Sequence, residues 1–238
     1  MKEGFSQIFM ISSTGGKPIQ VTSEKFNHYS FDWMSGSDGF VFSSNYTEDW
    51  EYDFRNSEIY SISVNGSKLQ QLTDRNGPDM GAAVSPDGKS IAYLGYEDKV
   101  QTYQINNLTI MDIDGSNKRT INIDLDRNIE SLKWSADGKN LYFMYDNYGN
   151  TKIATTNLTG RIRKLIDDVG GTSIGRPYGG GSFSVSSEGE ISYTLTSPYH
   201  PADIGYYEGN SIKRLTNLNN DLLRGKDLGV IEEIWYNS

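Results

Sequence analysis

The chain has 238 residues, and its 22 basic against 31 acidic side chains give a net charge of -9. Nucleic-acid-binding proteins neutralise phosphates with clustered Lys and Arg, so this balance argues against a nucleic-acid partner. A mean hydropathy of -0.58 and the lack of an 18-residue apolar run argue against a membrane-spanning helix. The lack of cysteine excludes disulfides, thiol catalysis and cysteine zinc sites, and only His28 and His200 remain for chemistry that needs a histidine.

The predicted strands fall into groups of four, separated by glycine turns. Before the first complete group, the chain has only the strands 7–11 and 19–22. The complete groups follow in chain order: 29–33, 40–42, 58–62 and 69–73; 82–85, 91–94, 108–112 and 119–121; 132–135, 141–144, 152–155 and 163–165; and 183–186, 191–195, 203–206 and 212–216. One more strand is expected within 228–236.

Two glycine turns recur in phase along the chain. The first consists of an acidic residue and glycine at spacings of 49, 50 and 51 residues: Asp38-Gly39, Asp87-Gly88, Asp137-Gly138 and Glu188-Gly189. The second occurs at Gly15-Gly16, Asn65-Gly66, Asp114-Gly115, Thr159-Gly160 and Glu208-Gly209. Asp-Gly between alternating strands is a strong hairpin signal, because glycine accepts the positive φ that tight turns require.

A four-strand unit repeated about every fifty residues predicts an all-β fold, a β-propeller of four-stranded antiparallel blades. We assign a partial blade to 1–22, complete blades to 23–73, 74–122, 123–166 and 167–216, and a linker with one strand to 217–238. Either the terminal strands share one blade and close a five-bladed ring, or the chain is a segment of a seven- or eight-bladed propeller. The start in mid-blade favours the segment.

Several motifs carry a family resemblance. Val-Ser-Pro-Asp-Gly-Lys-Ser-Ile-Ala-Tyr at 84–93 and Ile-Met-Asp-Ile-Asp-Gly at 110–115 resemble the repeat shared by the Tol-system translocation protein and prolyl oligopeptidase-family propellers. More specific segments lie at 55–60, 72–79, 170–178, 214–219 and 232–238. Together they resemble the propeller of acylaminoacyl-peptidase-like and dipeptidyl-peptidase-like serine peptidases.

The resemblance covers essentially the whole chain from about Gln7 and implies an attached partner. In that family the last propeller strand leads into a C-terminal α/β-hydrolase peptidase domain, which holds the catalytic Ser, Asp and His. No residue here matches them, so we assign no catalytic residue to this chain. Dipeptidyl-peptidase-like members also contact the substrate N-terminus through paired Glu residues. Glu48 and Glu51 lie in a long loop but match no such motif.

The segment 171–175, Gly-Thr-Ser-Ile-Gly, matches the G-x-S-x-G pattern of a nucleophile elbow. An elbow needs a strand before the serine and a helix after it. Here Arg176-Pro177-Tyr178 and three glycines follow, and they cannot continue a helix. We therefore place Ser173 in a loop joining two blades.

No metal site or cofactor is predicted. Asp112-Ile113-Asp114-Gly115 begins like a calcium loop, but an EF-hand needs Glu at its twelfth position, which is Ile123 here. Glycosylation triplets begin at Asn45, Asn65, Asn107 and Asn157. In a chain this rich in Asn we interpret them as chance matches.

One end of the predicted propeller carries long loops. The loops between second and third strands, and the links between blades, share that end, and they include 45–56, 95–107 and 197–201. Long loops on a rigid scaffold are where function usually lies. We therefore expect the ligand-binding surface at this end.

The links between blades carry arginines in near-register. Arg75, Arg127 and Arg176 are separated by 52 and 49 residues, and His28 lies at the equivalent place one blade earlier. Such donors would form a partial ring that binds a peptide carbonyl or a C-terminal carboxylate. These residues and Tyr178 are the predicted substrate contacts.

A structural alternative stays open for the arginines. Asp74 and Asp126 each precede one of them, so the pair can mark a repeated turn in which Arg bonds backbone carbonyls. Arg176 lacks an adjacent acid and precedes aromatic Tyr178, which makes it the favoured contact.

By resemblance, the chain is expected to be a non-catalytic propeller that gates and positions peptide substrates for an attached serine peptidase. Its expected partners are that C-terminal domain and a peptide, with no nucleic acid and no membrane. The alternative is a free-standing Tol-system-like propeller that binds proteins or peptides. A glycan hydrolase would need acidic pairs that converge on the channel, and no spacing argues for them. The sequence assigns no compartment.

Overall fold

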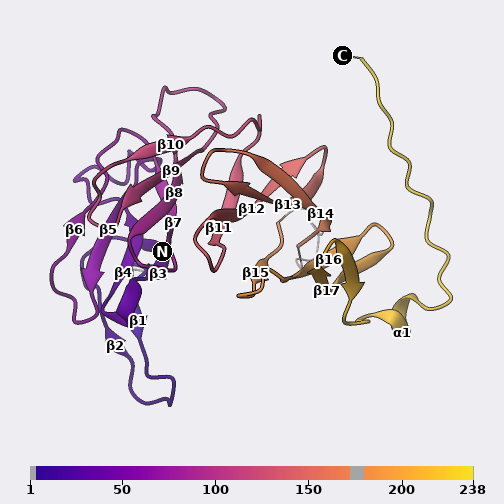
Figure 1. Ribbon diagram of the computed structural model, residues 1–238, viewed down its shortest axis with the longest axis horizontal. Coiled ribbons are helices and arrows are strands. Elements are labelled where there is room, and N and C mark those ends of the chain that lie inside the picture. The colour runs from indigo at the N-terminus through magenta and orange to yellow at the C-terminus, as the bar shows by residue number, and fades with distance from the viewer. Residues whose placement is uncertain (1–3, 172–179, 238) are drawn as a thin grey trace. The chain divides into compact units, whose positions relative to one another are not determined.

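The computed structural model describes residues 4–171 and 180–237, and its regular secondary structure is almost entirely antiparallel β-sheet (Figure 1). The chain forms two compact units. The first comprises Met1–Met144 and Thr155–Arg163, and the second comprises Tyr145–Ala154 and Lys164–Ser238. Within the described residues, no helix is long and apolar enough to cross a membrane.

Two four-stranded sheets contain most of the strand residues of the first unit. One contains β3 (His28–Trp33), β4 (Gly39–Ser44), β5 (Glu58–Ser63) and β6 (Gln70–Gln71), in that order. The other contains β7 (Asp79–Val84), β8 (Ser90–Gly95), β9 (Asn107–Asp112) and β10 (Arg119–Ile121). Ahead of them, β1 (Phe9–Met10) and β2 (Ile19–Gln20) pair as a short hairpin, and a 3-10 turn, Ser35–Ser37, lies between β3 and β4.

The later strands continue this up-and-down order. Neighbouring strands are β11 (Ile129–Trp134), β12 (Asn140–Asn147), β13 (Asn150–Asn157) and β14 (Ile162–Val169). The second unit adds β15 (Phe183–Val185), β16 (Ile191–Ser197), β17 (His200–Glu208) and β18 (Ser211–Arg214), followed by the short helix α1 (Asn220–Leu223). Within that unit Val169 of β14 pairs with Leu195 of β16.

Adjacent residues of β4 and β5 face two different cores, because strand side chains alternate between the faces of a sheet. One core contains Ile8, Val21, Phe40, Phe42, Tyr60 and Ile62. The other contains Val41, Ile59, Leu72, Ala82, Ile91, Tyr93 and Met111. The β3–β6 sheet is therefore packed face to face between the β1–β2 hairpin and the β7–β10 sheet, and β7 contacts both β3 and β4 (Figure 1).

Two of the acidic-glycine turns share one set of hydrogen bonds. Ser85 Oγ donates to Asp87 Oδ1 at 2.7 Å, and Ser135 Oγ donates to Asp137 Oδ1 at 2.7 Å. Each carboxylate also accepts a backbone N–H two residues later at 3.1 Å. These bonds from Ser85 and Ser135 lower the pKa of both aspartates. The repeated Ser-x-Asp-Gly sequence thus has a local structural role.

The predicted strands differ from the structure mainly at the sheet edges. Strand β6 has only two residues, where the pattern predicts 69–73, and both are exposed. Residues 228–236, predicted to include a strand, have no strand conformation. An edge strand is hydrogen-bonded on one side only, and an extended segment becomes a strand only when a neighbour pairs with it.

Candidate functional site

A cavity of about 470 Å³ opens at the long-loop end of the first unit. Its walls come from the start of β3, the β4–β5 loop, the start of β7 and the residue that follows β8. We refer to it as the aromatic cavity. Its principal lining residues are Tyr29, Trp50, Glu51, Phe54, Asn56 and Tyr96.

Asn45 holds the β4–β5 loop in shape. Its Nδ2 donates to the carbonyl of Asp53 at 2.8 Å, and its Oδ1 accepts the N–H and the hydroxyl of Thr47 at 3.1 and 2.6 Å. Trp50 packs edge-to-face on Phe5, with ring centroids 5.9 Å apart. The Asn45-Tyr46-Thr47 triplet therefore forms a turn that supports the aromatic wall.

The floor of the aromatic cavity joins the two four-stranded sheets. Ser57 accepts the N–H of Asp79 at 2.7 Å, and Ser57 Oγ donates to the carbonyl of Asp79 at 3.1 Å. The carbonyl of Pro78 accepts the N–H of Tyr96 at 3.3 Å. Because these are mainly backbone contacts, the floor is fixed by the fold itself.

Among the described residues, the aromatic cavity is lined by one basic residue, Arg55, and one acidic residue, Glu51. Arg55 lies 3.2 Å from a carboxylate oxygen of Asp98 and 6.0 Å from the ring centre of Phe54, so its charge is already paired. Glu51 also lines the cavity and is exposed. Two buried polar atoms, Ser43 Oγ and Asn56 Oδ1, have no hydrogen-bond partner among the described residues.

Two buried carboxyl groups, Glu58 and Asp79, directly follow the floor residues Ser57 and Pro78 in the sequence. Glu58 Oε2 accepts the hydroxyl of Thr73 at 2.5 Å, and Asp79 forms an ion pair with Arg75. Burial raises the pKa of Glu58 from 4.5 to about 7, and burial also raises the pKa of Asp79 despite the opposing charge of Arg75. Arg75, Thr73 and Asp79 also line a second cavity of about 190 Å³.

Comparison with known proteins connects this fold to peptidases. A family model of the dipeptidyl peptidase IV N-terminal region matches residues 1–101. The chain is 25% identical over 138 residues to dipeptidyl-peptidase 5 of Porphyromonas gingivalis, covering 57% of this chain and 20% of that protein. It is 33% identical over 111 residues to dipeptidyl-peptidase 5 of Arthroderma otae, covering 42% and 15%. The chain thus spans a fifth or less of the length of these relatives.

Solved structures share the fold. TolB from Acinetobacter baumannii superposes with a TM-score of 0.63 at 18% identity, over 88% of this chain and 48% of that one. A puromycin-hydrolyzing peptidase from Mycobacterium tuberculosis superposes with a TM-score of 0.63 at 14% identity, over 90% and 35%. Together, the family model, the relatives and the structural neighbours support a propeller domain of a prolyl oligopeptidase-family peptidase. The resemblance expected from the motifs is confirmed.

The predicted contact residues occupy different environments in this propeller. The side chain of His28 is buried at the start of β3, where Nδ1 meets the carbonyl of Ser6 at 2.9 Å and Nε2 meets Tyr46 Oη at 2.7 Å. Arg75 bonds Asp79 at the second cavity, and Arg127 lies 3.6 Å from a carboxylate oxygen of the adjacent Asp126. None of the three lines the aromatic cavity. Arg176, Tyr178 and the serine of the elbow-like motif, Ser173, lie outside the described residues.

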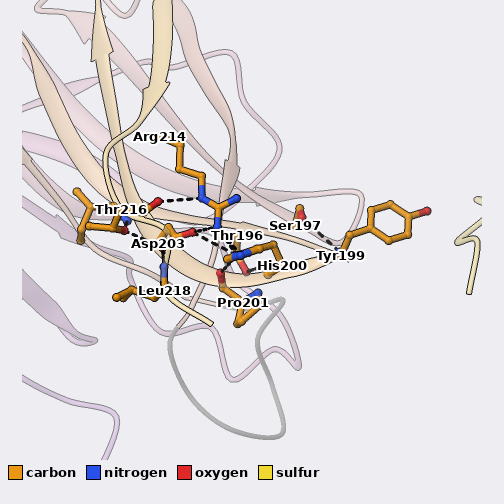
Figure 2. Close-up of polar contacts among 10 residues, drawn as sticks. Thr196, Ser197, Tyr199, His200, Pro201, Asp203, Arg214, Thr216 and Leu218 are labelled. Atoms are coloured by element: carbon orange, nitrogen blue, oxygen red, sulfur yellow. Dashed lines mark hydrogen bonds and ion pairs between the residues drawn. The ribbon is translucent and has the colours of Figure 1, made fainter. Parts of the chain in front are cut away.

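A polar cluster joins β17 to β18 in the second unit of the propeller (Figure 2). The nearly buried Asp203 accepts the hydroxyl of Thr216 at 2.7 Å and the N–H of Leu218 at 2.8 Å. Burial opposes ionisation of Asp203, but these bonds and the charges of Arg214 and His200 lower its pKa. Arg214 of β18 contacts both ring nitrogens of His200 of β17. The cluster therefore links the side chains of these two strands.

The sequence located the long loops but not the composition of the aromatic cavity. Trp50 and Tyr96 lie in two of the loops expected to carry function. Tyr29 belongs to a predicted inner strand, where the residue pattern predicts packing instead of ligand contact. Strand alternation could have predicted the position of Tyr29. Because Tyr29 directly follows the buried His28, its side chain faces the opposite side of the strand.

Proposed function

We propose that this propeller binds peptide substrates at its long-loop end and helps to gate and position them for an attached serine peptidase domain. The observation that carries the proposal is the aromatic cavity, a concave, partly polar site of about 470 Å³ at the end where the loops are long. The relationship to dipeptidyl peptidases supports the peptide as ligand and the hydrolase domain as partner.

We also propose the blade division 1–22, 23–73, 74–122, 123–166, 167–216 and 217–238. The four-stranded sheets β3–β6 and β7–β10 support its second and third segments. The two-stranded β1–β2 hairpin supports a partial blade at the start of the described chain. A five-bladed ring and a segment of a seven- or eight-bladed propeller stay the two options for blade number.

Among the predicted substrate contacts, the proposal gives the first place to Arg176 and Tyr178. Arg127 donates to the backbone carbonyl of the adjacent Asp126, which supports the alternative of a repeated turn in which Arg bonds backbone carbonyls. Arg75 pairs with the side chain of Asp79 instead. His28 has both ring nitrogens within hydrogen-bonding distance of oxygen atoms, which supports a structural role for it.

Calorimetric titration of the 238-residue chain with unstructured peptides tests this proposal. Binding is expected, and Trp50→Ala should weaken it about tenfold or more, because truncating a central aromatic contact typically costs at least 1 to 2 kcal/mol. Tyr103→Ala is the matched control, since Tyr103 is exposed in another long loop and does not line the cavity. Absence of binding, or equal losses in the two variants, would refute the proposed site.

A free-standing propeller that binds proteins or peptides is the second candidate. The putative TolB of Agrobacterium tumefaciens supports it, with a TM-score of 0.67 over 89% of this chain and 74% of that one. The open reading frame beyond Ser238 distinguishes the two functions. Continuation into a hydrolase domain with a strand–serine–helix elbow supports gating, and a stop codon supports the stand-alone binder.

A further inference from the structure

Two residues of the aromatic cavity carry a polar atom that lacks a partner. Ser43 and Asn56 line it, and their atoms Ser43 Oγ and Asn56 Oδ1 are buried without a hydrogen-bond partner among residues 4–171 and 180–237. Ser43 is only 2% exposed. A buried polar group left unpaired is costly and rare, which makes this wall of the cavity a candidate functional surface.

The chemistry of the lining defines that ligand. The exposed carboxyl of Glu51 accepts hydrogen bonds, so it suits a ligand with N–H or O–H donors. The rings of Tyr29, Trp50 and Phe54 offer π faces, which attract cations. Arg55 is the cation of the lining, and the carboxylate of Asp98 at 3.2 Å balances it. The cavity therefore presents acceptors and aromatic faces to its ligand.

A net charge of -9 adds to this local preference, because an acidic surface raises the local concentration of cationic ligands. The volume of about 470 Å³ is within the usual range of ligand-binding pockets. Lys and Arg suit such walls, since their alkyl stems cover apolar surface while the charged head meets polar atoms.

We propose that the aromatic cavity binds the basic side chain, Lys or Arg, of a peptide. The proposal rests on the proposed function, in which peptides bind at this end, and it specifies which peptides are preferred. Glu51 pairs with the cationic head, and the rings of Trp50 and Phe54 pack along the stem.

The experiment is calorimetric titration of the 238-residue chain with four tripeptide amides. Acetyl-Ala-Lys-Ala-amide and its Arg analogue carry the cation on a side chain. Acetyl-Ala-norleucine-Ala-amide keeps the stem without charge, and unacetylated Ala-norleucine-Ala-amide carries a cation only at its N-terminus. The Lys and Arg peptides are expected to bind about tenfold more tightly than both norleucine peptides.

Two glutamates of the same loop give matched variants. Glu51→Gln is expected to reduce the preference for Lys over norleucine from about tenfold to about twofold, while binding of norleucine is unchanged. Glu48→Gln removes an equal charge from an exposed residue that does not line the cavity, and it should retain the preference. Circular dichroism and thermal midpoints establish that both variants fold.

The outcomes separate the two proposals. If all four peptides bind equally, the basic side-chain site is refuted and the peptide-binding function stands. If the unacetylated norleucine peptide binds as well as the Lys peptide, the cavity recognises the N-terminus and the side-chain assignment is wrong. If no peptide binds, both proposals fail. Equal losses in Glu51→Gln and Glu48→Gln would show that long-range charge, not this cavity, selects the cation.

Discussion

The carboxyl group of Glu58 shows how the fold sets the chemistry of one residue. The side chain is inside the molecule between β5 and the end of the β5–β6 hairpin, and its Oε2 accepts the hydroxyl of Thr73 at 2.5 Å. Burial raises its pKa to about 7, and the nearby Asp79 acts in the same direction. A proton on this carboxyl is therefore part of the stable folded state at mildly acid pH.

This pKa predicts how stability depends on pH. A carboxyl with a raised pKa binds its proton more tightly in the folded chain than in the unfolded one. The free energy of unfolding should therefore fall as pH rises from about 4.5 to about 7. Glu58→Gln keeps an acceptor for Thr73 but cannot ionise, so it should flatten this fall, leaving the contribution of Asp79, whose pKa burial also raises.

Urea unfolding at about pH 5 and about pH 8 measures the effect. Glu48→Gln is the control, because Glu48 is exposed, and it should follow the parent chain at both values. If Glu58→Gln retains the full pH dependence of the parent, burial of this carboxyl does not cause it.

At the scale of elements, a threonine closes the outer edge of three hairpins. The hydroxyls of Thr22, Thr73 and Thr216 accept the N–H groups of Ile8, Ile59 and Ile204 at 2.9, 2.8 and 2.9 Å. In each case the side chain two residues earlier donates to the threonine carbonyl; these donors are Gln20, Gln71 and Arg214. The hairpins therefore remain closed although β2 and β6 have only two residues each.

Removing one of these hydroxyls should be costly. Thr73→Val keeps the shape but leaves the N–H of Ile59 without its acceptor and Glu58 without its donor, so we expect a loss of about 2 to 4 kcal/mol. Thr120→Val, an exposed β10 residue, should change stability by less than about 0.5 kcal/mol. Chemical unfolding compares them, and equal losses would show that the hydroxyl of Thr73 adds no stability.

The second glycine turn also has a packing role in three of the repeats. An added Cβ would lie 2.6 Å from the carbonyl oxygen of Val21 at Gly66, 2.9 Å from that of Leu72 at Gly115, and 1.9 Å from that of Asn122 at Gly160. Each carbonyl lies at the outer edge of the preceding hairpin or sheet. The recurring glycine thus permits positive φ and lets successive sheets approach closely.

Gly160→Ala and Gly149→Ala separate these two effects. Both glycines have positive φ, at +89° and +77°, but a Cβ at Gly149 would meet nothing within 4 Å. The backbone conformation alone should cost Gly149→Ala about 1 to 2 kcal/mol. Gly160→Ala should lose a further 1 to 3 kcal/mol, roughly, from overlap with Asn122. Similar unfolding free energies for the two variants would remove the packing explanation.

Across the whole molecule, the sequence predicted the repeated hairpins but not the aromatic cavity. The phased glycine turns predicted antiparallel hairpins in four-strand groups, because turn chemistry and strand alternation are local properties. The aromatic cavity escaped prediction, because Tyr29, Trp50 and Tyr96 come from separate segments that only the fold brings together. Residues 228–236 have strand-like composition, yet strand formation depends on a neighbour that composition does not specify.

The charge of the whole chain gives a last prediction about ligand binding. Salt screens the long-range attraction between a net charge of -9 and a cationic ligand. The Debye length is about 10 Å at 0.1 M salt and about 3 Å at 1 M. Raising NaCl from about 0.05 M to about 0.5 M should therefore weaken binding of the Lys tripeptide several-fold and leave the acetylated norleucine tripeptide unchanged. The contact with Glu51 inside the cavity is screened less than the surface charges, so part of the Lys preference should persist at high salt. Complete loss of the preference would mean that the cation is attracted by the overall charge and not held in the cavity.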